Sequence, residues 1–94
     1  MRYTLVIYDI TDDNLRNEIA QICMDNGLVR IQKSAFLGVI DSQRRKHLIH
    51  LLRRKLGSNK GNIQVFVICE DDMRYRTIIS NEEVPREAGD TIII

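Results

Sequence analysis

The chain has little of what marks a secreted, membrane or metal-cluster protein. Its 94 residues include only two cysteines, which are isolated and lack the spacing of a metal motif. No apolar run approaches the roughly 20 residues that a helix needs to cross a bilayer. No small-residue cleavage site follows Arg2, and there is no glycine-rich phosphate loop. We therefore expect a cytoplasmic protein without membrane contact, in which Cys23 and Cys69 are small buried hydrophobes rather than ligands or a disulfide pair.

What is present is typical of one small folded domain. The composition, 44% hydrophobic and 29% charged, suits a globular chain rather than a disordered one. A chain of this length can bury a modest core, and oligomerisation would add to it. The net charge of +1 conceals an asymmetry: residues 41–60 hold seven basic residues and one acid (+6), and the remainder holds seven basic and twelve acidic residues (−5). Such a basic segment says more about partners than the overall charge does.

Hydrophobic periodicity and helix-end signals predict six elements. In chain order they are a strand over Tyr3–Asp9, a helix that begins after Thr11 or Asp12 and ends at Asn26-Gly27, strands over Leu28–Lys33 and Ser34–Ile40, a helix from Asp41-Ser42 to Leu56, and a strand over Ile63–Cys69. Gly38 within a strand indicates a bulge or the close approach of another backbone. The order β-α-β-β-α-β predicts an α+β fold of the ferredoxin-like type.

The last part of the chain is harder to place. Arg74–Ile79 could form a short strand, and the polar stretch that follows contains the only proline, Pro85. We therefore separate a ferredoxin-like domain, residues 1–80, from a tail, residues 81–94. The tail ends in Thr91–Ile94, which would invite aggregation if left exposed. We expect this extra strand to pair with a sheet edge, either its own or that of a second protomer, and such an exchange is a low-cost route to a homodimer.

The stretch that begins at Tyr8 and Asp9 joins the end of the first strand to the start of the first helix. Junctions of this kind often carry functional groups that a rigid scaffold aims. A carboxylate at Asp9 can hold a divalent cation, and Arg16, one turn into the helix, can hold a phosphate. The alternatives are that Asp9 merely ends the strand or caps the helix, and that Arg16 pairs with Asp12 or Asp13.

The second helix is apolar on one side and basic on the other. Its leucines share one side, and the opposite side carries the residues that we expect to bind nucleic acid: Lys46, His50, Arg53 and Arg54. A charged stripe is usually a solvated face, but like charges unrelieved by acids favour a polyanion as partner. Such contacts follow the phosphate backbone, ignore base sequence and weaken with salt. No aromatic residues are interleaved with these cations, which argues against a sequence reader of single strands.

Two motifs together carry a resemblance to a known family. The first is Tyr8-Asp9-Ile10 followed by Asp12-Asp13 and Arg16, and the second is GLVRIQKSAFLG over residues 27–38. In this order they resemble the small CRISPR-associated protein that works beside the CRISPR integrase during spacer acquisition, the second of the numbered Cas proteins. The resemblance covers nearly the whole chain. It implies a ferredoxin-like homodimer in which the C-terminal strand of each subunit completes the sheet of the other.

The resemblance also implies roles for individual residues. Asp9 would be the ligand of Mg²⁺, or of Mn²⁺, facing the same residue of a second subunit, with Tyr8 beside it. Arg16, Arg30 and Phe36 match further positions linked to activity in the family. Some members are described as metal-dependent nucleases on single-stranded RNA or duplex DNA, and in others the protein bridges integrase dimers on a duplex.

Some residues have a simpler interpretation or depart from the family pattern. From the sequence alone, Phe36 is expected in the core, Arg30 on a solvated strand face, and Tyr8 as a half-buried strand residue whose hydroxyl could reach Asp9. Some nuclease-active relatives have a second arginine two residues after the first. This chain has Glu18 there, and a carboxylate would repel phosphate.

Two functional hypotheses of different classes follow. The first is an enzyme, a Mg²⁺-dependent endonuclease whose paired Asp9 carboxylates hold the ion. The second is a non-catalytic dimer whose basic faces hold duplex DNA for the CRISPR integrase. One dimer could do both. A third possibility, an unrelated ferredoxin-like dimer that binds a small ligand, has no specific motif in its support.

Overall fold

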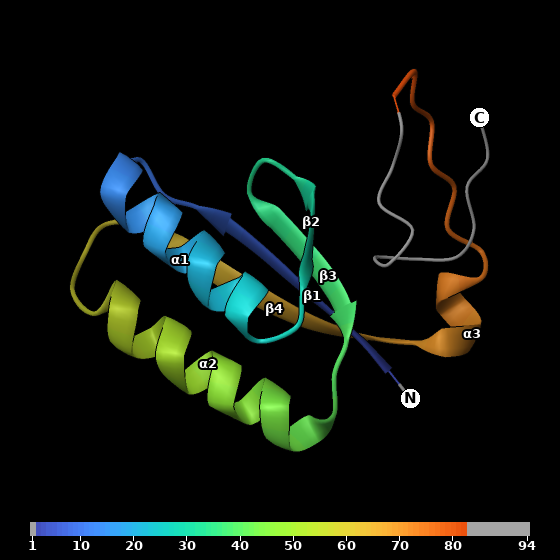
Figure 1. Cartoon of the computed structure of the whole chain (residues 1–94), viewed down its shortest axis with the longest axis horizontal. Coiled ribbons are helices and arrows are strands. Elements are labelled where there is room, and N and C mark those ends of the chain that lie inside the picture. Colours follow the sequence, from blue (N-terminus) through green and yellow to red (C-terminus); the bar gives the residue numbers. More distant parts are fainter. Residues whose placement is uncertain (1, 83–94) are drawn as a thin grey trace.

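The computed structural model describes residues 2–82, which form a four-stranded antiparallel sheet with two long helices on one face (Figure 1). The elements are β1 (Arg2–Asp9), α1 (Asp13–Asp25), β2 (Val29–Gln32), β3 (Ala35–Val39), α2 (Ser42–Leu56), β4 (Asn62–Cys69) and the one-turn α3 (Glu70–Met73). The strand order is β2-β3-β1-β4, so β1 lies at the centre between β3 and β4. This arrangement confirms the predicted ferredoxin-like fold.

Both long helices begin and end where local sequence signals predict. The Asp12 carboxylate accepts a hydrogen bond from the Leu15 amide at 2.7 Å, and Asp41 accepts one from the Arg44 amide at 2.7 Å. Each bond satisfies an amide in the first turn that has no partner within the helix. At the other ends the chain adopts positive φ, +91° at Gly27 and +51° at Gly57, which glycine accepts without strain. None of the described helices has the length and hydropathy of a membrane span.

The main core lies between the helices and the sheet. Alternate residues of β1, including Val6 and Tyr8, are buried on the face that α1 and α2 cover. The buried residues of this core are Val6, Tyr8, Ile10, Leu15, Ile19, Ala20, Cys23, Leu28, Phe36, Ile40, Leu48 and Leu52. Since the core takes residues from both helices and from β1 and β3, with Ile63 and Val65 of β4 packed against it, the helix layer and the sheet are held as one unit.

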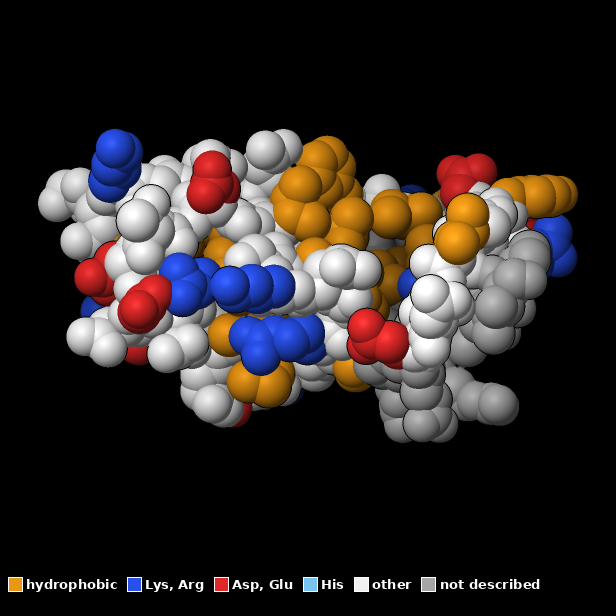
Figure 2. Space-filling model, turned by 90° about the horizontal axis from the view of Figure 1, so that it is seen from above, with side chains coloured by type: hydrophobic (Ala, Val, Ile, Leu, Met, Phe, Trp, Pro, Cys, Tyr) orange, Lys and Arg blue, Asp and Glu red, His pale blue; other side chains and the backbone are white. Residues whose placement is uncertain are grey.

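The opposite face of the sheet is also apolar but has little cover. The short helix α3 packs on it, where Met73 and Leu37 are buried together. The partly buried residues around them are Tyr3, Leu5, Val29, Ile31 and Ile68, and Phe66 on the same face is 42% exposed. Figure 2 shows hydrophobic side chains gathered along one margin of the molecule, which fits an uncovered face. A surface of this kind is typical of an interaction site.

Two expectations about the second half of the chain are wrong. Arg74–Ile79 is not a strand: a single helical turn at α3 follows β4 directly, and the next residues continue this turn, with the Tyr75 amide donating to Asp72 O at 3.1 Å. The intrinsic strand propensity of this segment is outweighed because α3 packs against β4 and β1 and buries Met73 there. Cys69 is exposed rather than buried, and its thiol donates to the Asp72 carboxylate at 3.0 Å. The predicted pairing of Thr91–Ile94 lies outside the described residues.

Gly38 is required because another part of the chain passes close to it. A Cβ atom there would lie 2.7 Å from Gly27 O and 2.9 Å from Leu28 Cδ2. The predicted close approach is confirmed, whereas the bulge lies in β2, between Arg30 and Gln32. We expect Gly38→Ala to lower the free energy of unfolding by about 1–3 kcal/mol through overpacking. Urea denaturation measures this value.

The matched control for Gly38→Ala is a small change in the exposed loop after α2. Ser58→Ala alters a residue that lies outside the core, and its expected effect on the free energy of unfolding is below about 0.5 kcal/mol. If the two variants are equally stable, the chain at Gly27 can move away from an added Cβ atom at Gly38 without a cost in stability, and the prediction is wrong.

Candidate nucleic-acid interface and metal-binding carboxylate

Asp9 is the last residue of β1, and its side chain is exposed. It stands opposite Asn62 of β4, and its carboxylate has no hydrogen bond or ion pair with any other described residue. Its backbone is tightly held, since a Cβ atom at Gly61, where φ is +141°, would lie 2.9 Å from Asp9 O. The carboxylate is therefore free while the end of the strand that carries it is fixed.

The residues around Asp9 fit a magnesium site only in part. The Asp12 carboxylate caps α1, and the Asp13 carboxylate pairs with Arg16. Within residues 2–82 no three His, Cys, Asp or Glu side chains are grouped to hold a metal ion. Mg²⁺ binds through one or two carboxylates with waters and phosphate oxygens completing its shell. One chain thus offers a single free carboxylate at this place. A metal site shared symmetrically by two chains would take one such carboxylate from each.

Arg16 holds the turn that follows Asp9. Its Nη1 atom donates to Ile10 O and Thr11 O, both at 3.3 Å, and its Nη2 atom pairs with the Asp13 carboxylate. The predicted pairing with a first-turn acid is confirmed for Asp13. Because three of its contacts are made within the chain, the guanidinium stabilises the turn between β1 and α1. A phosphate contact by Arg16 stays a prediction, and it would compete with these bonds.

Tyr8, Phe36 and Arg30 form a stack on the helix-covered face of the sheet. The rings of Tyr8 and Phe36 lie 6.2 Å apart between centroids and are inclined by 16°. The Arg30 guanidinium carbon lies 5.0 Å from the centroid of Phe36. Phe36 is fully buried, which confirms its predicted place in the core. Three of the five residues linked to activity by resemblance therefore do meet.

The expected approach of the Tyr8 hydroxyl to Asp9 is wrong. Successive side chains of a strand point to opposite faces of the sheet. Tyr8 is buried under the helices, and Asp9 is exposed on the other side. The stack and the free carboxylate are consequently separated by the sheet itself.

The environment of Tyr8 keeps its hydroxyl protonated. Burial raises the pKa of Tyr8 above its usual value, and the nearby Arg30 guanidinium, with Arg16 further off, lowers the pKa by less. The Tyr8 hydroxyl is buried, and the Arg30 guanidinium lies close enough to favour its deprotonated form through hydrogen bonding and charge, though less than burial disfavours that form. A neutral phenol can donate a hydrogen bond but is a poor general base. Burial likewise raises the pKa of Cys23 to about 12, so its thiol is inert.

The exposed side of α2 is basic as predicted. Leu48 and Leu52 are buried against the sheet, which turns the residues predicted to bind nucleic acid outward: Lys46, His50, Arg53 and Arg54. None of these four has an ion pair with another described residue. By contrast, Lys55 on the flank pairs with Glu18 of α1 at 2.7 Å. The carboxylate that replaces a second arginine thus neutralises one cation of α2.

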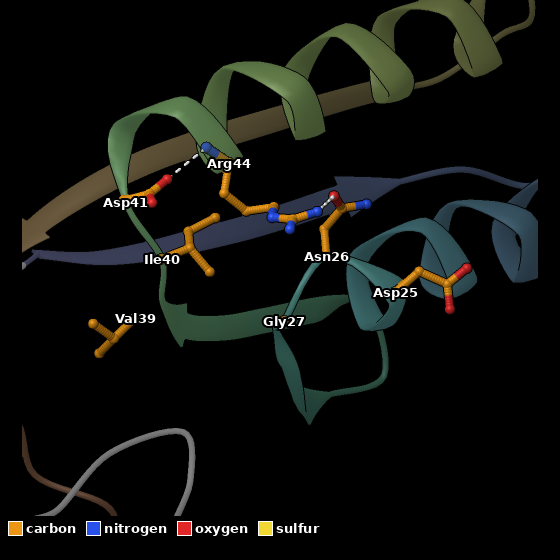
Figure 3. A pocket seen from close by; sticks show the side chains of 7 residues that line it. All are labelled: Asp25, Asn26, Gly27, Val39, Ile40, Asp41 and Arg44. Carbon is orange, nitrogen blue, oxygen red and sulfur yellow. Dashed lines mark hydrogen bonds between the residues drawn. The ribbon is translucent and has the colours of Figure 1, made fainter.

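A pocket between the end of α1 and the start of α2 was not predicted. Its volume is about 390 Å³, and its lining residues are Asp25, Asn26, Gly27, Val39, Ile40, Asp41 and Arg44 (Figure 3). Arg44 reaches from α2 toward Asn26, and its Nη1 atom donates to Asn26 Oδ1 at 3.4 Å. The sequence predicted both of the helix ends that border the pocket. It could not predict that the fold places these two helix ends next to each other. Its single cation is already engaged, so we do not assign the pocket a role in binding nucleic acid.

These features define a class of protein, a small ferredoxin-like domain with a basic outer helix and a free carboxylate at the end of its central strand. The family model described as CRISPR associated protein Cas2 matches residues 1–76. The chain belongs to this family.

Individual relatives support the assignment. The chain is 45% identical over 82 residues to the CRISPR-associated endoribonuclease Cas2 of Korarchaeum cryptofilum, covering 87% of this chain and 88% of the relative. It is 32% identical over 83 residues to a CRISPR-associated endonuclease Cas1/endonuclease Cas2 fusion of Thermoproteus tenax, covering 88% of this chain and 30% of the fusion. The crystal structure of Streptococcus pyogenes Cas2 superimposes with a TM-score of 0.71 at 19% identity, covering 83% of this chain and 99% of that one, which shows the shared fold.

Proposed function

We propose that this protein acts in CRISPR adaptation as a dimeric, nucleic-acid-binding partner of the CRISPR integrase. The observation that carries the proposal is the outer face of α2, where Lys46, Arg53 and Arg54 are exposed and have no acidic partner among the described residues. Such a row of cations suits the phosphate backbone of a duplex. The integrase as partner is supported by the Thermoproteus tenax relative, which joins Cas1 and Cas2 in one chain.

The uncovered face of the sheet supports the homodimer. Leu5 and Phe66 are paired neighbours on this face; Leu5 is only partly buried and Phe66 is exposed. Packing a second copy against the face would remove apolar surface from water, which is the main driving force of association. Asp9 lies on this side of β1, so a symmetric dimer of this kind would turn both Asp9 carboxylates into the same interface. Two dimer-related copies of α2 would also double the basic surface.

The second candidate function is a metal-dependent endonuclease on single-stranded RNA or duplex DNA. The free Asp9 carboxylate favours it, as does the name of the Korarchaeum cryptofilum relative, an endoribonuclease. Asp9 from each of two chains would hold Mg²⁺ or Mn²⁺. When bound, the ion would supply an activated water and neutralise charge on the scissile phosphate. Arg16 would keep the turn after Asp9 in place, and Tyr8 would take no part as a base.

The basic face of α2 is tested by replacing two of its cations. We expect Arg53→Ala combined with Arg54→Ala to weaken duplex DNA binding and to reduce its salt dependence. Each lost phosphate contact lowers the slope of log K against log salt by about 0.9, so two contacts in one chain would lower it by about 1.8. Fluorescence anisotropy of a labelled duplex at several NaCl concentrations gives the slope.

Lys55→Ala is the matched control on the same helix. It removes the same charge, but Lys55 is already paired with Glu18, and a surface pair of this kind contributes only about 0–1 kcal/mol to stability. We expect its slope to remain near that of the wild type. If the arginine variant and the control have equal slopes, the outer face of α2 does not follow the DNA backbone.

A further inference from the structure

A hollow at the N-terminal end of α2 is bordered by two arginines from different elements. Its volume is about 420 Å³, and its lining residues are Arg2, Ile40, Asp41, Ser42 and Arg45. Ile40 and Asp41, which Figure 3 labels, also border the pocket at the end of α1, so the two hollows are neighbours at the link between β3 and α2. The hollow lies at the opposite end of β1 from Asp9, because Arg2 begins that strand and Asp9 ends it.

Arg45 stands on the side of α2 that packs on the sheet. It precedes Leu48 by three residues and Leu52 by seven, which are positions on one side of an α-helix, and both leucines are buried. Arg45 is itself half-buried, unlike the exposed cations of the outer face of α2. Its guanidinium has no hydrogen bond or ion pair with another described residue. A partly buried charge without a partner is costly, so this position requires a counter-ion.

The other charged groups around the hollow do not supply that counter-ion. Arg2 is exposed, and its side chain also has no hydrogen bond or ion pair with another described residue. Asp41 is the one carboxylate among these lining residues, and it accepts the amide of Arg44 as the cap of α2 without forming an ion pair with either arginine. Two like charges that border one hollow repel each other. An anion between them would remove the repulsion and give each a partner.

We propose that Arg2 and Arg45 bind a phosphate group in this hollow. Arginine forms paired hydrogen bonds to phosphate oxygens, and the Ser42 hydroxyl adds a further donor. A phosphate group fits better than a carboxylate, because it offers three acceptor oxygens to three separate groups of donors. None of the described lining residues is aromatic, so the phosphate itself is recognised rather than a base.

The site does not depend on the dipole of α2 or on the duplex binding proposed above. The Asp41 carboxylate lies at the positive end of α2 and offsets it, which leaves the two arginines as the binding groups. The hollow is also separate from the outer face of α2. A phosphate that fits it can belong to the backbone of a nucleic acid or to a small phosphate compound, and the experiment distinguishes these two sources.

Inorganic phosphate is the first probe, and thermal unfolding of the full chain is the measurement. A ligand that binds the folded state raises Tm with its concentration. We expect the Tm of the wild type to rise in sodium phosphate relative to sodium chloride at equal ionic strength. Arg45→Met, which places an apolar side chain on the apolar side of α2, should weaken phosphate binding about tenfold or more, the value of a hydrogen bond to a charged group. Arg2→Gln should have the same effect.

Lys60→Met is the control, because it removes one positive charge from the loop between α2 and β4, at the other end of α2. Phosphate also stabilises proteins in general by its exclusion from their surface, and that rise should be the same in every variant. The control should therefore keep the full response of the wild type.

Three results would overturn the site. The first is an equal response of Arg45→Met and Lys60→Met to phosphate, and the second is a wild type with the same Tm in phosphate and in chloride. The third is an equal rise in sodium acetate, which would indicate that the hollow takes carboxylates and so an acidic segment of a protein. If Arg45→Met does not fold, Arg2→Gln decides by the same comparison with Lys60→Met.

Duplex DNA then identifies the source of the phosphate. If the site takes a backbone phosphate, Arg45→Met should also lower the slope of log K against log salt by about 0.9 for each chain in contact. A lost phosphate response with an unchanged slope would assign the site to a small phosphate compound. Because the first probe is inorganic phosphate, a wild type that does not bind duplex DNA would remove the proposed function and leave this site in place.

Discussion

Replacing Asp9 by asparagine is expected to abolish metal-dependent cleavage of nucleic acid. The change keeps the shape of the side chain and removes the charge that would attract a divalent ion. A metal ion at a phosphodiester contributes several kcal/mol of transition-state stabilisation, and a loss of about 3 kcal/mol alone slows the reaction about 100-fold. Fold stability should be unaffected because the carboxylate has no partner among the described residues. Cleavage of labelled single-stranded RNA and duplex DNA is measured with Mg²⁺, Mn²⁺ or EDTA.

The control for this experiment is Asp25→Asn, purified in parallel. Asp25 is an exposed carboxylate at the end of α1, where it accepts a hydrogen bond from Gln21 at 2.8 Å. The control should cleave as the wild type does. Equal cleavage by wild type and Asp9→Asn would show that the activity comes from a contaminant or from another site. A wild type that binds duplex DNA but does not cleave would leave the binding function alone.

Local signals in the sequence were sufficient to predict the helices and the order of helices and strands along the chain. Asp12 and Asp41 each precede an apolar-periodic segment by a few residues, and the capping bonds form within three residues of them. Gly27 and Gly57 end the two helices for equally local reasons. The basic side of α2 was readable too, because the leucines that must be buried determine which residues remain outside.

The arrangement of the site depends on contacts that no local pattern specifies. Arg30 meets Phe36 because of the register between β2 and β3, which includes a bulge. The placement of Tyr8 and Asp9 on opposite faces is a different case, because strand alternation alone predicts it and the expectation that the Tyr8 hydroxyl reaches Asp9 overlooked this local rule. The ion pair of Glu18 with Lys55 joins residues far apart in the chain, and it depends on how α1 packs beside α2.

Replacing Phe36 by alanine should have the largest effect on stability of any change considered. Phe36 is fully buried at the centre of the sheet and is in contact with both Tyr8 and Arg30. Removing a buried ring costs about 3–5 kcal/mol of unfolding free energy, because contacts are lost and a cavity remains. This is a large part of the 5–15 kcal/mol, approximately, by which domains are stable. Urea denaturation at several protein concentrations measures the loss.

Phe66→Ala is the matched comparison, since Phe66 is the other phenylalanine and lies in the same sheet. It is 42% exposed on the uncovered face, so less contact is lost within one chain. If that face joins two copies, the stability of Phe66→Ala should depend on protein concentration differently from that of the wild type. The free energy of unfolding lost in Phe36→Ala should instead be the same at every concentration. Phe36→Leu, which refills most of the cavity, should recover much of the loss. A Phe36→Ala protein no less stable than Phe66→Ala would mean that the stack of Tyr8, Phe36 and Arg30 is not part of the core.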